Sequence, residues 1–358
     1  MRLLPLIVIV LAGSLSASEP ASTYPLWDGR ESVADYAKRV NLPPTKTLDL
    51  GNGVKLELVM IPAGKFMMGT PAPEKPLVGQ TMSGLSGGML LIYAAIGLIR
   101  ARRNRTRPQF SMGLMVVMKF VAAMGVWGGV RWNDASKHPD YYPTEHPAHV
   151  VTLTRPMYMG KYHVTQEQYQ AVIGTNPSTY IGKDNPVENV SWDDAQAFCK
   201  KVTEQTEVNV GLPTEAEWEY ACRAGTTTTY NSGDAEGDLD GVAWYCENSK
   251  DSTHPVGKKQ SNAFGLYDMH GNLYQWCQDW YRDYYYSKSP AENPQGPVHG
   301  VFRVLRGGSW HDVPIDCRSA DRYRDHPDSR NVFVGFRVLA PAVRNASASA
   351  TRSTLGTK

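Results

Sequence analysis

Two apolar segments interrupt this chain and constrain any fold that the rest of it can adopt. Residues 81–99 carry no charged side chain, and residues 110–130 carry only Lys119. Each segment is close to the ~20 residues with which an α-helix crosses a bilayer. We therefore expect a transmembrane helical hairpin over residues 81–132, inserted into a domain built from both flanks. The alternative is a Gly- and Met-rich loop packed on the domain, because Lys119 is costly inside a span unless it is paired or reaches the interface.

The residues around these segments carry a topology signal. The connecting loop contains Arg100, Arg102, Arg103, Arg105 and Arg107, and an excess of Lys and Arg marks cytoplasmic loops. The N-terminus agrees, because Met1-Arg2 precedes an apolar run and small residues, as in a secretory signal peptide over residues 1–18. An uncleaved anchor there would export the rest equally. We expect an exported protein on the periplasmic or extracellular face of the membrane, with a short cytoplasmic arginine-rich loop.

The charge balance argues against one class of partner. The chain has 37 basic and 35 acidic residues, a net charge of +2, which gives no general attraction to nucleic acid. The arginine loop is better explained by topology than by nucleic-acid binding. We expect no nucleic-acid partner and contact with the lipid bilayer through residues 81–132.

The remaining sequence divides into an N-terminal segment, one discontinuous domain and a tail. Residues 19–47 are polar, with a short helical pattern that ends before Pro43-Pro44. Residues 48–80 together with 133–340 should form the domain. Residues 341–358 are rich in Ser, Ala and Thr and should be a disordered tail.

A hairpin is predicted at the start of the domain. Residues 54–59 alternate in polarity like a strand. Pro62-Ala63-Gly64 predicts a turn, and residues 65–69 look like the returning strand.

Three later helices are predicted from their first residues. Thr165, Ser191 and Thr214 each precede a short helical pattern, as N-cap residues do. Thr214 with Glu217 also matches a capping box. The three glutamates of residues 215–219 could be paired carboxylates for acid–base work. Capping and an exposed helix face explain them better.

A series of short motifs in order along the chain resembles the sulfatase-modifying factor, or formylglycine-generating enzyme, family. The motifs are Phe66-Met67-Met68-Gly69, Glu145-His146-Pro147-Ala148-His149-Val150, Met159-Gly160-Lys161-Tyr162, Val164-Thr165-Gln166, Asn176-Pro177-Ser178, Pro186-Val187-Glu188, Val190-Ser191-Trp192, Leu212-Pro213-Thr214-Glu215-Ala216-Glu217-Trp218-Glu219-Tyr220, Phe264-Gly265-Leu266-Tyr267-Asp268-Met269, Gly271-Asn272, Arg306-Gly307-Gly308-Ser309-Trp310 and Gly335-Phe336-Arg337. The resemblance implies an α+β domain of the complex C-type-lectin-like kind, with little regular secondary structure. It also implies a sulfatase or other peptide as substrate, whose cysteine is oxidised by dioxygen to formylglycine.

The chemistry of that family requires two cysteine thiolates after the Gly-Gly-Ser motif, because thiolates are the soft ligands that Cu(I) prefers. The family spacing places them three and eight residues after the serine. Counted from Ser309, these positions are Asp312 and Cys317. The resemblance therefore implies Cys317, Ser309 and Trp310 as catalytic residues, with copper bound only if Cys317 is a ligand. A shift of three residues would instead place Cys317 where it bonds Cys222, whose neighbourhood forms a disulfide in the family.

The resemblance implies further site residues. Asp312, Arg318 and Arg322 would lie along the cleft, although both arginines could equally be structural ion-pair donors. A calcium site would take side chains from Asp268 and Gln275 and carbonyl oxygens from Gly271 and Leu273. The family has a glutamate where this chain has Gln275, so the lost charge should weaken calcium binding.

Cysteine usage leaves several pairings open. The chain has five cysteines, and export would permit disulfides. The odd number leaves at least one thiol unpaired within the chain. Besides Cys222 and Cys317, the remaining candidates Cys246 and Cys277 form either a second disulfide or two buried thiols.

Two functions follow from these observations. The first is an exported, membrane-tethered oxidase of sulfatase cysteines. The second is a catalytically degenerate lectin-like binding or scaffold module for a peptide, a glycan or a partner protein. Asp312 in the place of a copper thiolate favours the second, since a fold does not fix a function. An iron-dependent enzyme on this scaffold would need a His-rich helical domain, and the sequence contains none.

Overall fold

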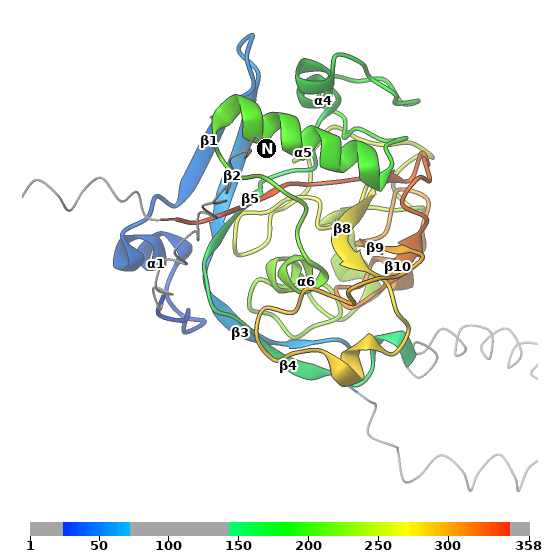
Figure 1. Ribbon diagram of the computed structural model, residues 1–358. Helices are drawn as coiled ribbons and strands as arrows, with labels where there is room; N and C mark the ends of the chain where they lie inside the picture. The colour runs from blue at the N-terminus through cyan, green and yellow to red at the C-terminus, as the bar shows by residue number, and fades with distance from the viewer. Residues whose placement is uncertain (1–23, 72–142, 344–358) are drawn as a thin grey trace, which may run out of the picture.

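The computed structural model describes residues 24–71 and 143–343 (Figure 1). These residues form two four-stranded sheets, ordered β1-β2-β5-β12 and β10-β9-β8-β11, and two two-stranded sheets, β3-β4 and β6-β7. The strands are β1 (Thr45–Asp49), β2 (Lys55–Ile61), β3 (Gly64–Met68), β4 (His149–Leu153), β5 (Met157–Gly160), β6 (Ala243–Trp244), β7 (His270–Gly271), β8 (Tyr274–Trp280), β9 (Arg303–Arg306), β10 (Tyr323–Asp325), β11 (Val334–Gly335) and β12 (Leu339–Pro341).

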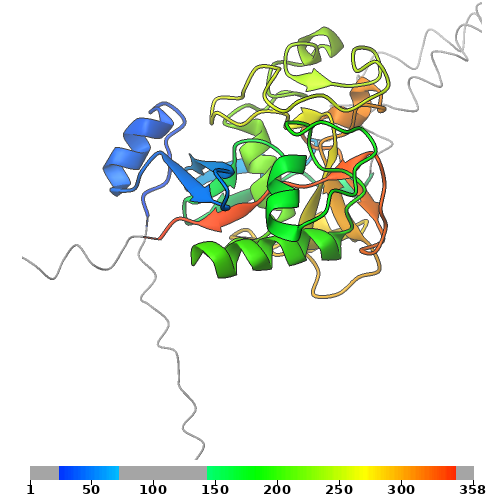
Figure 2. The ribbon, with the colours of Figure 1, turned by 90° about the horizontal axis from the view of Figure 1, so that it is seen from above.

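The first large sheet joins the two ends of the described chain. β5 pairs antiparallel with β2 on one side and with β12 on the other, so the blue and red ends of the ribbon lie in one sheet (Figures 1 and 2). β1 begins at Thr45 and pairs with β2 along its whole length. The segment before residue 48 therefore contributes a strand to the domain.

The hairpin predicted over residues 54–69 is wrong, although both of its strands exist. β2 is hydrogen-bonded to β1 on one edge and to β5 on the other. No edge of β2 remains for β3, which pairs with β4 in a separate sheet.

The predicted helix starts are confirmed. The helices are α1 (Val33–Val40), α4 (Gln166–Ile173), α5 (Trp192–Thr206) and α6 (Glu215–Arg223), with short 3-10 turns η2 (Pro143–Glu145), η3 (Glu236–Leu239), η4 (Tyr285–Lys288) and η5 (Pro314–Cys317). Thr165, Ser191 and Thr214 each accept a backbone N–H as the N-cap residue, in complete capping boxes. In Figure 1, α5 crosses above the sheets, and α6 lies below α5.

The core between α5 and the sheets is built from aromatic side chains. Phe198 of α5 stacks on Tyr169 of α4 at 5.7 Å and meets Phe336 edge to face at 5.4 Å. Trp276 of β8 is fully buried in the same cluster. This packing fixes β8, which carries one wall of the site described below.

A buried ionic network surrounds α6, and here the expected exposed face of the helix is wrong. Glu219 is fully buried and pairs with Arg306 and with Arg223, the latter at 2.9 Å. Glu215 is 2 % exposed and pairs with Arg322 at 2.6 Å. The arginines come from β9, from α6 itself and from the segment before β10, so α6 is tied to the second large sheet by charge.

The long segment between β3 and η2 leaves and re-enters the fold at one place. Thr70 donates its backbone N–H to the Glu145 carbonyl at 3.2 Å and its hydroxyl to the Glu145 carboxylate at 2.6 Å. Glu145 also accepts both Nη atoms of Arg318, at 2.9 and 2.8 Å. Residues 72–142 are therefore inserted between two points that are bonded to each other.

Three expectations fall on residues that the structure does not describe. They are the signal peptide over residues 1–18, the hairpin over residues 81–132 and most of the tail over residues 341–358. Within residues 24–71 and 143–343, every helix is too short or too polar to cross a membrane.

Candidate functional site

The Gly-Gly-Ser turn follows β9 directly. Gly307 and Gly308 both have positive φ, 100° and 73°. A Cβ at Gly308 would lie 2.5 Å from the Cys317 sulfur. Glycine is required there because the turn lies directly against that side chain.

Ser309 and Asp312 form a closed polar pair after this turn. The Asp312 carboxylate accepts the Ser309 backbone N–H at 3.0 Å and also the Ser309 hydroxyl. The Asp312 N–H donates back to the Ser309 carbonyl at 3.2 Å. Ser309 is fully buried, so its hydroxyl serves the turn and does not face a substrate. Burial raises the pKa of Asp312.

Trp310 is buried next to the Gly-Gly-Ser turn and packs on aromatic side chains. It is 5 % exposed, and its indole N–H donates to the Val332 carbonyl at 3.2 Å. The ring packs on Tyr180 and Phe333 at 5.3 and 4.9 Å between centroids. Its position is that of a packing residue.

Cys317 does not form a copper site with its neighbours. The side chain is fully buried, and burial raises the pKa of the thiol well above its usual value. The thiolate is the metal ligand, and the partner position is Asp312, a hard ligand already bonded to Ser309. Cu(I) prefers soft ligands, so the residues present do not fit it.

Neither of the two cysteine pairs is joined by a disulfide, and His270 contacts both members of the first pair. All five cysteines are free thiols. The Cys222 sulfur lies 3.6 Å from Nε2 of His270, whose Nδ1 donates to the Cys317 carbonyl at 2.7 Å. Cys277 packs in the core around α6, whereas Cys246 packs against the separate cluster that contains Cys317.

The expected calcium ligands also have other partners. Gln275 Oε1 accepts Nε1 of Trp218 at 2.7 Å and Nε of Arg337 at 2.6 Å. The Leu273 carbonyl accepts Nε2 of His163 at 3.0 Å.

Of the remaining two residues, Gly271 donates its N–H to the Gly307 carbonyl at 2.7 Å, a bond that does not involve the carbonyl oxygen expected as a ligand. Asp268 accepts the Gly257 N–H with one carboxylate oxygen at 2.8 Å, and the other is buried without a partner. The Arg337 guanidinium and the Trp218 indole thus occupy the Gln275 oxygen that a calcium ion would use, and this set of residues does not fit calcium. Elsewhere in residues 24–71 and 143–343, no three His, Cys, Asp or Glu side chains gather as metal ligands.

The two arginines expected along the cleft are ion-pair donors. Arg318 is 4 % exposed and pairs with Glu145 at 2.8 Å and with Asp321 at 3.5 Å. Arg322 is held by both oxygens of Glu215, at 2.6 and 2.9 Å. Of the two arginines, only Arg322 also lines the cavity beside Asp312.

That cavity has a volume of about 470 Å³ and is lined mainly by carboxylates and aromatic rings. We call it the acidic cavity, and its lining residues are Tyr274, His311, Asp312, Asp316, Asp321, Arg322, Tyr323, Asp325, Asn331, Phe333 and Val334. Tyr274 stacks on Tyr323 at 5.1 Å, and His311 stacks on Phe333 at 5.1 Å. The acidic cavity adjoins the Gly-Gly-Ser turn through Asp312, and its volume is within the usual range of small-molecule sites.

Most residues of the acidic cavity were missed from the sequence. Tyr323 and Asp325 are two residues apart on β10, so their alternation places them on one face of the strand and could have signalled a common surface. Tyr274 and Phe333 come from other parts of the chain, and no local pattern joins them to β10.

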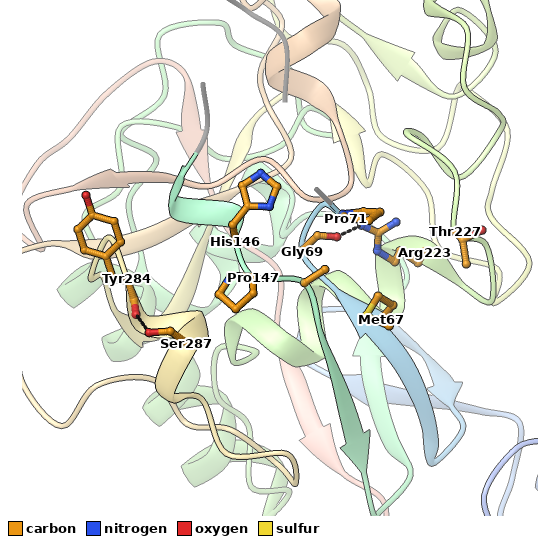
Figure 3. A pocket seen from close by; sticks show the side chains of 10 residues that line it. Met67, Gly69, Pro71, His146, Pro147, Arg223, Thr227, Tyr284 and Ser287 are labelled. Atoms are coloured by element: carbon orange, nitrogen blue, oxygen red, sulfur yellow. Dashed lines mark hydrogen bonds between the residues drawn. The ribbon is translucent and has the colours of Figure 1, made fainter. Parts of the chain in front are cut away.

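A larger cavity of about 990 Å³ lies at the insertion point (Figure 3). Tyr284 and Ser287 stand on one side, and Met67 and Arg223 on the other, with Arg223 donating to the Gly69 carbonyl at 3.3 Å. Pro71, the last described residue before the gap, is part of its wall. We assign no site there, because residues 72–142, which follow Pro71, lie outside the described part of the chain.

Comparison with known proteins finds one family and a range of relatives. The family model described as a sulfatase-modifying factor enzyme 1-like domain matches residues 122–342. The formylglycine-generating enzyme of Streptomyces coelicolor is 39 % identical over 178 residues, which are 45 % of this chain and 54 % of that enzyme. The serine/threonine-protein kinase pkn1 of Chlamydia caviae is 35 % identical over 221 residues, 54 % of this chain and 34 % of the kinase.

The fold has solved counterparts. The structure of Treponema denticola variable protein 1 superposes with a TM-score of 0.60 at 26 % identity, covering 84 % of this chain and 99 % of that one. The chain spans about half of the enzyme and about a third of the kinase that it resembles.

Proposed function

The chain belongs to the family of sulfatase-modifying factor enzyme 1-like domains, and from that premise we propose that it is an exported, membrane-tethered binding module. One observation carries the proposal. Asp312 stands where the copper-dependent members need their first thiolate, and its carboxylate closes the turn onto Ser309. The acidic cavity beside Asp312 is the proposed binding site.

The range of relatives supports a function other than oxidation. Proteins with the names of a kinase and of a variable protein share sequence or fold with this chain. Function on a shared fold depends on the residues of the site and not on the scaffold. Here the site offers carboxylates and aromatic rings and lacks a pair of thiolates.

Oxidation of a sulfatase cysteine is the second candidate, and one experiment decides between the two. A cysteine-containing sulfatase peptide is incubated with the purified protein, Cu(I) and oxygen, and its mass is followed. We expect no conversion to the aldehyde, because Cys317 is a buried thiol whose pKa is raised and which has no second thiolate at the matching position.

The Streptomyces coelicolor formylglycine-generating enzyme is the positive control in the same buffer. Cys317→Ser should leave the result unchanged. Conversion by the wild-type protein that disappears in Cys317→Ser would establish the oxidase and end the binding-module proposal.

The proposed tether rests on the two apolar segments, residues 81–99 and 110–130, and on the bonded ends of the insertion at Thr70 and Glu145. Replacing residues 72–142 with a short Gly/Ser linker should release a folded domain from washed membranes. The insertion starts and ends at adjacent points, and such surface sites accept changes without loss of the core. Fractionation followed by thermal unfolding of the released protein measures both effects.

Two outcomes count against the tether. If the wild-type protein is already wholly soluble after membranes are washed, residues 81–132 do not anchor it. If the shortened protein stays with the membranes, the anchor is elsewhere, with residues 1–18 as the next candidate.

A further inference from the structure

His163 is a neutral histidine in the interior of the domain. The side chain is 1 % exposed. Burial, and then the charge of Arg337, lower the pKa of His163 to about 3. At neutral pH the ring therefore carries one N–H group and one nitrogen that can only accept a hydrogen bond.

The hydrogen-bond partner of one ring nitrogen defines the role of the other. Nε2 of His163 lies 3.0 Å from the Leu273 carbonyl oxygen. A carbonyl oxygen can only accept, so Nε2 carries the hydrogen and Nδ1 is the acceptor of the ring. Nδ1 is buried and has no hydrogen-bond partner within residues 24–71 and 143–343. A buried acceptor without a donor costs free energy of desolvation, which a donating ligand would offset.

A small cavity lies against the same side chain. Its volume is about 10 Å³, and its lining includes His163, Gly160, Tyr162 and Val338. A single water molecule needs about this much space. A Cβ on Gly160 would lie 3.1 Å from the Tyr162 carbonyl oxygen and 3.5 Å from the backbone nitrogen and oxygen of Val338. Polar backbone atoms of two lining residues thus lie together beside the α-carbon of Gly160.

We propose that this cavity binds a single water molecule, which donates one hydrogen bond to Nδ1 of His163 and the other to the carbonyl oxygen of Tyr162 or Val338. The volume and the buried acceptor are separate observations, and both fit this ligand. The volume excludes a larger molecule. The charge of Arg337, which acts on His163, disfavours a cation. Buried waters in proteins usually bond to polar groups that would otherwise lack a partner.

The bound water would extend a connection between the two large sheets. Tyr162 and His163 follow β5, and Val338 precedes β12, so this side of the cavity belongs to the first sheet. Leu273, which accepts from Nε2 of His163, precedes β8 of the second sheet. A chain of hydrogen bonds would then run from the first sheet through the water and the imidazole to the start of β8. This inference does not depend on the ligand of the acidic cavity.

The test is ¹⁵N NMR of the histidine rings in the full-length protein in detergent. An unprotonated ring nitrogen that accepts a hydrogen bond resonates at lower frequency than one with a bare lone pair. His270 is the internal reference, because its Nδ1 donates to the Cys317 carbonyl at 2.7 Å and its Nε2 accepts the Asn231 N–H at 3.1 Å. We expect the unprotonated nitrogen of His163 to resonate near that of His270. The ring C–H between the two nitrogens of His163 should also show a nuclear Overhauser effect to water.

His163→Gln assigns the signals by their loss, and its amide nitrogen can still donate to the Leu273 carbonyl. Thermal unfolding of this variant shows whether the fold is kept. A His163 nitrogen at clearly higher frequency than that of His270 would mean a bare lone pair and would overturn the proposal. A frequency like that of His270 without contact to water would place a protein donor at Nδ1, and would overturn it equally.

Discussion

Replacing Glu219 with glutamine should lower the free energy of unfolding by about 3–5 kcal/mol, the usual cost of leaving a buried charge without its partner. The Glu219 carboxylate accepts from Arg306, from Arg223 at 2.9 Å and from the Gly69 N–H at 2.9 Å. The amide would turn donors toward one of the guanidinium groups, both of which stay buried. Urea unfolding followed by tryptophan fluorescence measures the change.

The control is a surface pair of the same kind. Glu57 pairs with Lys161 at 3.0 Å, but its side chain is 56 % exposed. Glu57→Gln should therefore change the free energy of unfolding by less than about 1 kcal/mol. If Glu219→Gln costs no more than Glu57→Gln, the network around α6 does not stabilise the fold through its charges.

Acidification from pH 6.5 to pH 4 should destabilise the wild-type protein more than a variant that lacks His270. Burial lowers the pKa of His270 to about 4, whereas the unfolded chain binds a proton near 6.5. In this window the unfolded state binds more protons at this residue, so stability is lost as the pH falls. The difference from His270→Asn should approach about 1.4 kcal/mol per pH unit.

The comparison with a variant is needed because buried acids act in the opposite direction. Burial raises the pKa of Asp268 to about 6 and that of Asp279 well above its usual value. Their protonation favours the folded state as the pH falls. Both acids are present in His270→Asn, so their contributions cancel in the difference. His299→Gln, at an exposed position, is the control for replacing a histidine that is not buried. The same slope in His270→Asn and in the wild type would mean that His270 is not held neutral.

Local sequence signals predicted the helices of this fold, but the pairing of strands that are distant in the sequence could not be predicted from such signals. The capping residues Ser191 and Thr214 act through neighbours within three positions, so the sequence alone locates them. β3 follows β2 after two residues, yet its partner β4 is about eighty positions away across the insertion. A strand's partner depends on which edges the other strands have already filled.

The sequence likewise predicted only part of the candidate site. The motif around Ser309 located the turn, and Asp312 showed that the copper chemistry lacked a ligand. The burial of Glu215 beneath Arg322 could not be predicted, because the helical pattern of α6 does not distinguish a face that meets water from one that meets arginines. Tyr274 lies beside Tyr323 in the cavity because β8 and β10 come together there, and no local pattern joins these two strands.

The bonded ends of the insertion connect residues 72–142 mechanically to the rest of the domain. A pull on residues 72–142 reaches the domain first at Thr70 and Glu145. Glu145 is clamped by Arg318, and Arg318 also contacts Asp321 in the wall of the acidic cavity. Under the proposed tether, tension on residues 72–142 would pass to the cavity through two charged contacts, Glu145–Arg318 and Arg318–Asp321. In a tethered domain connected in this way, a force on the anchor would act on the wall of the proposed ligand site.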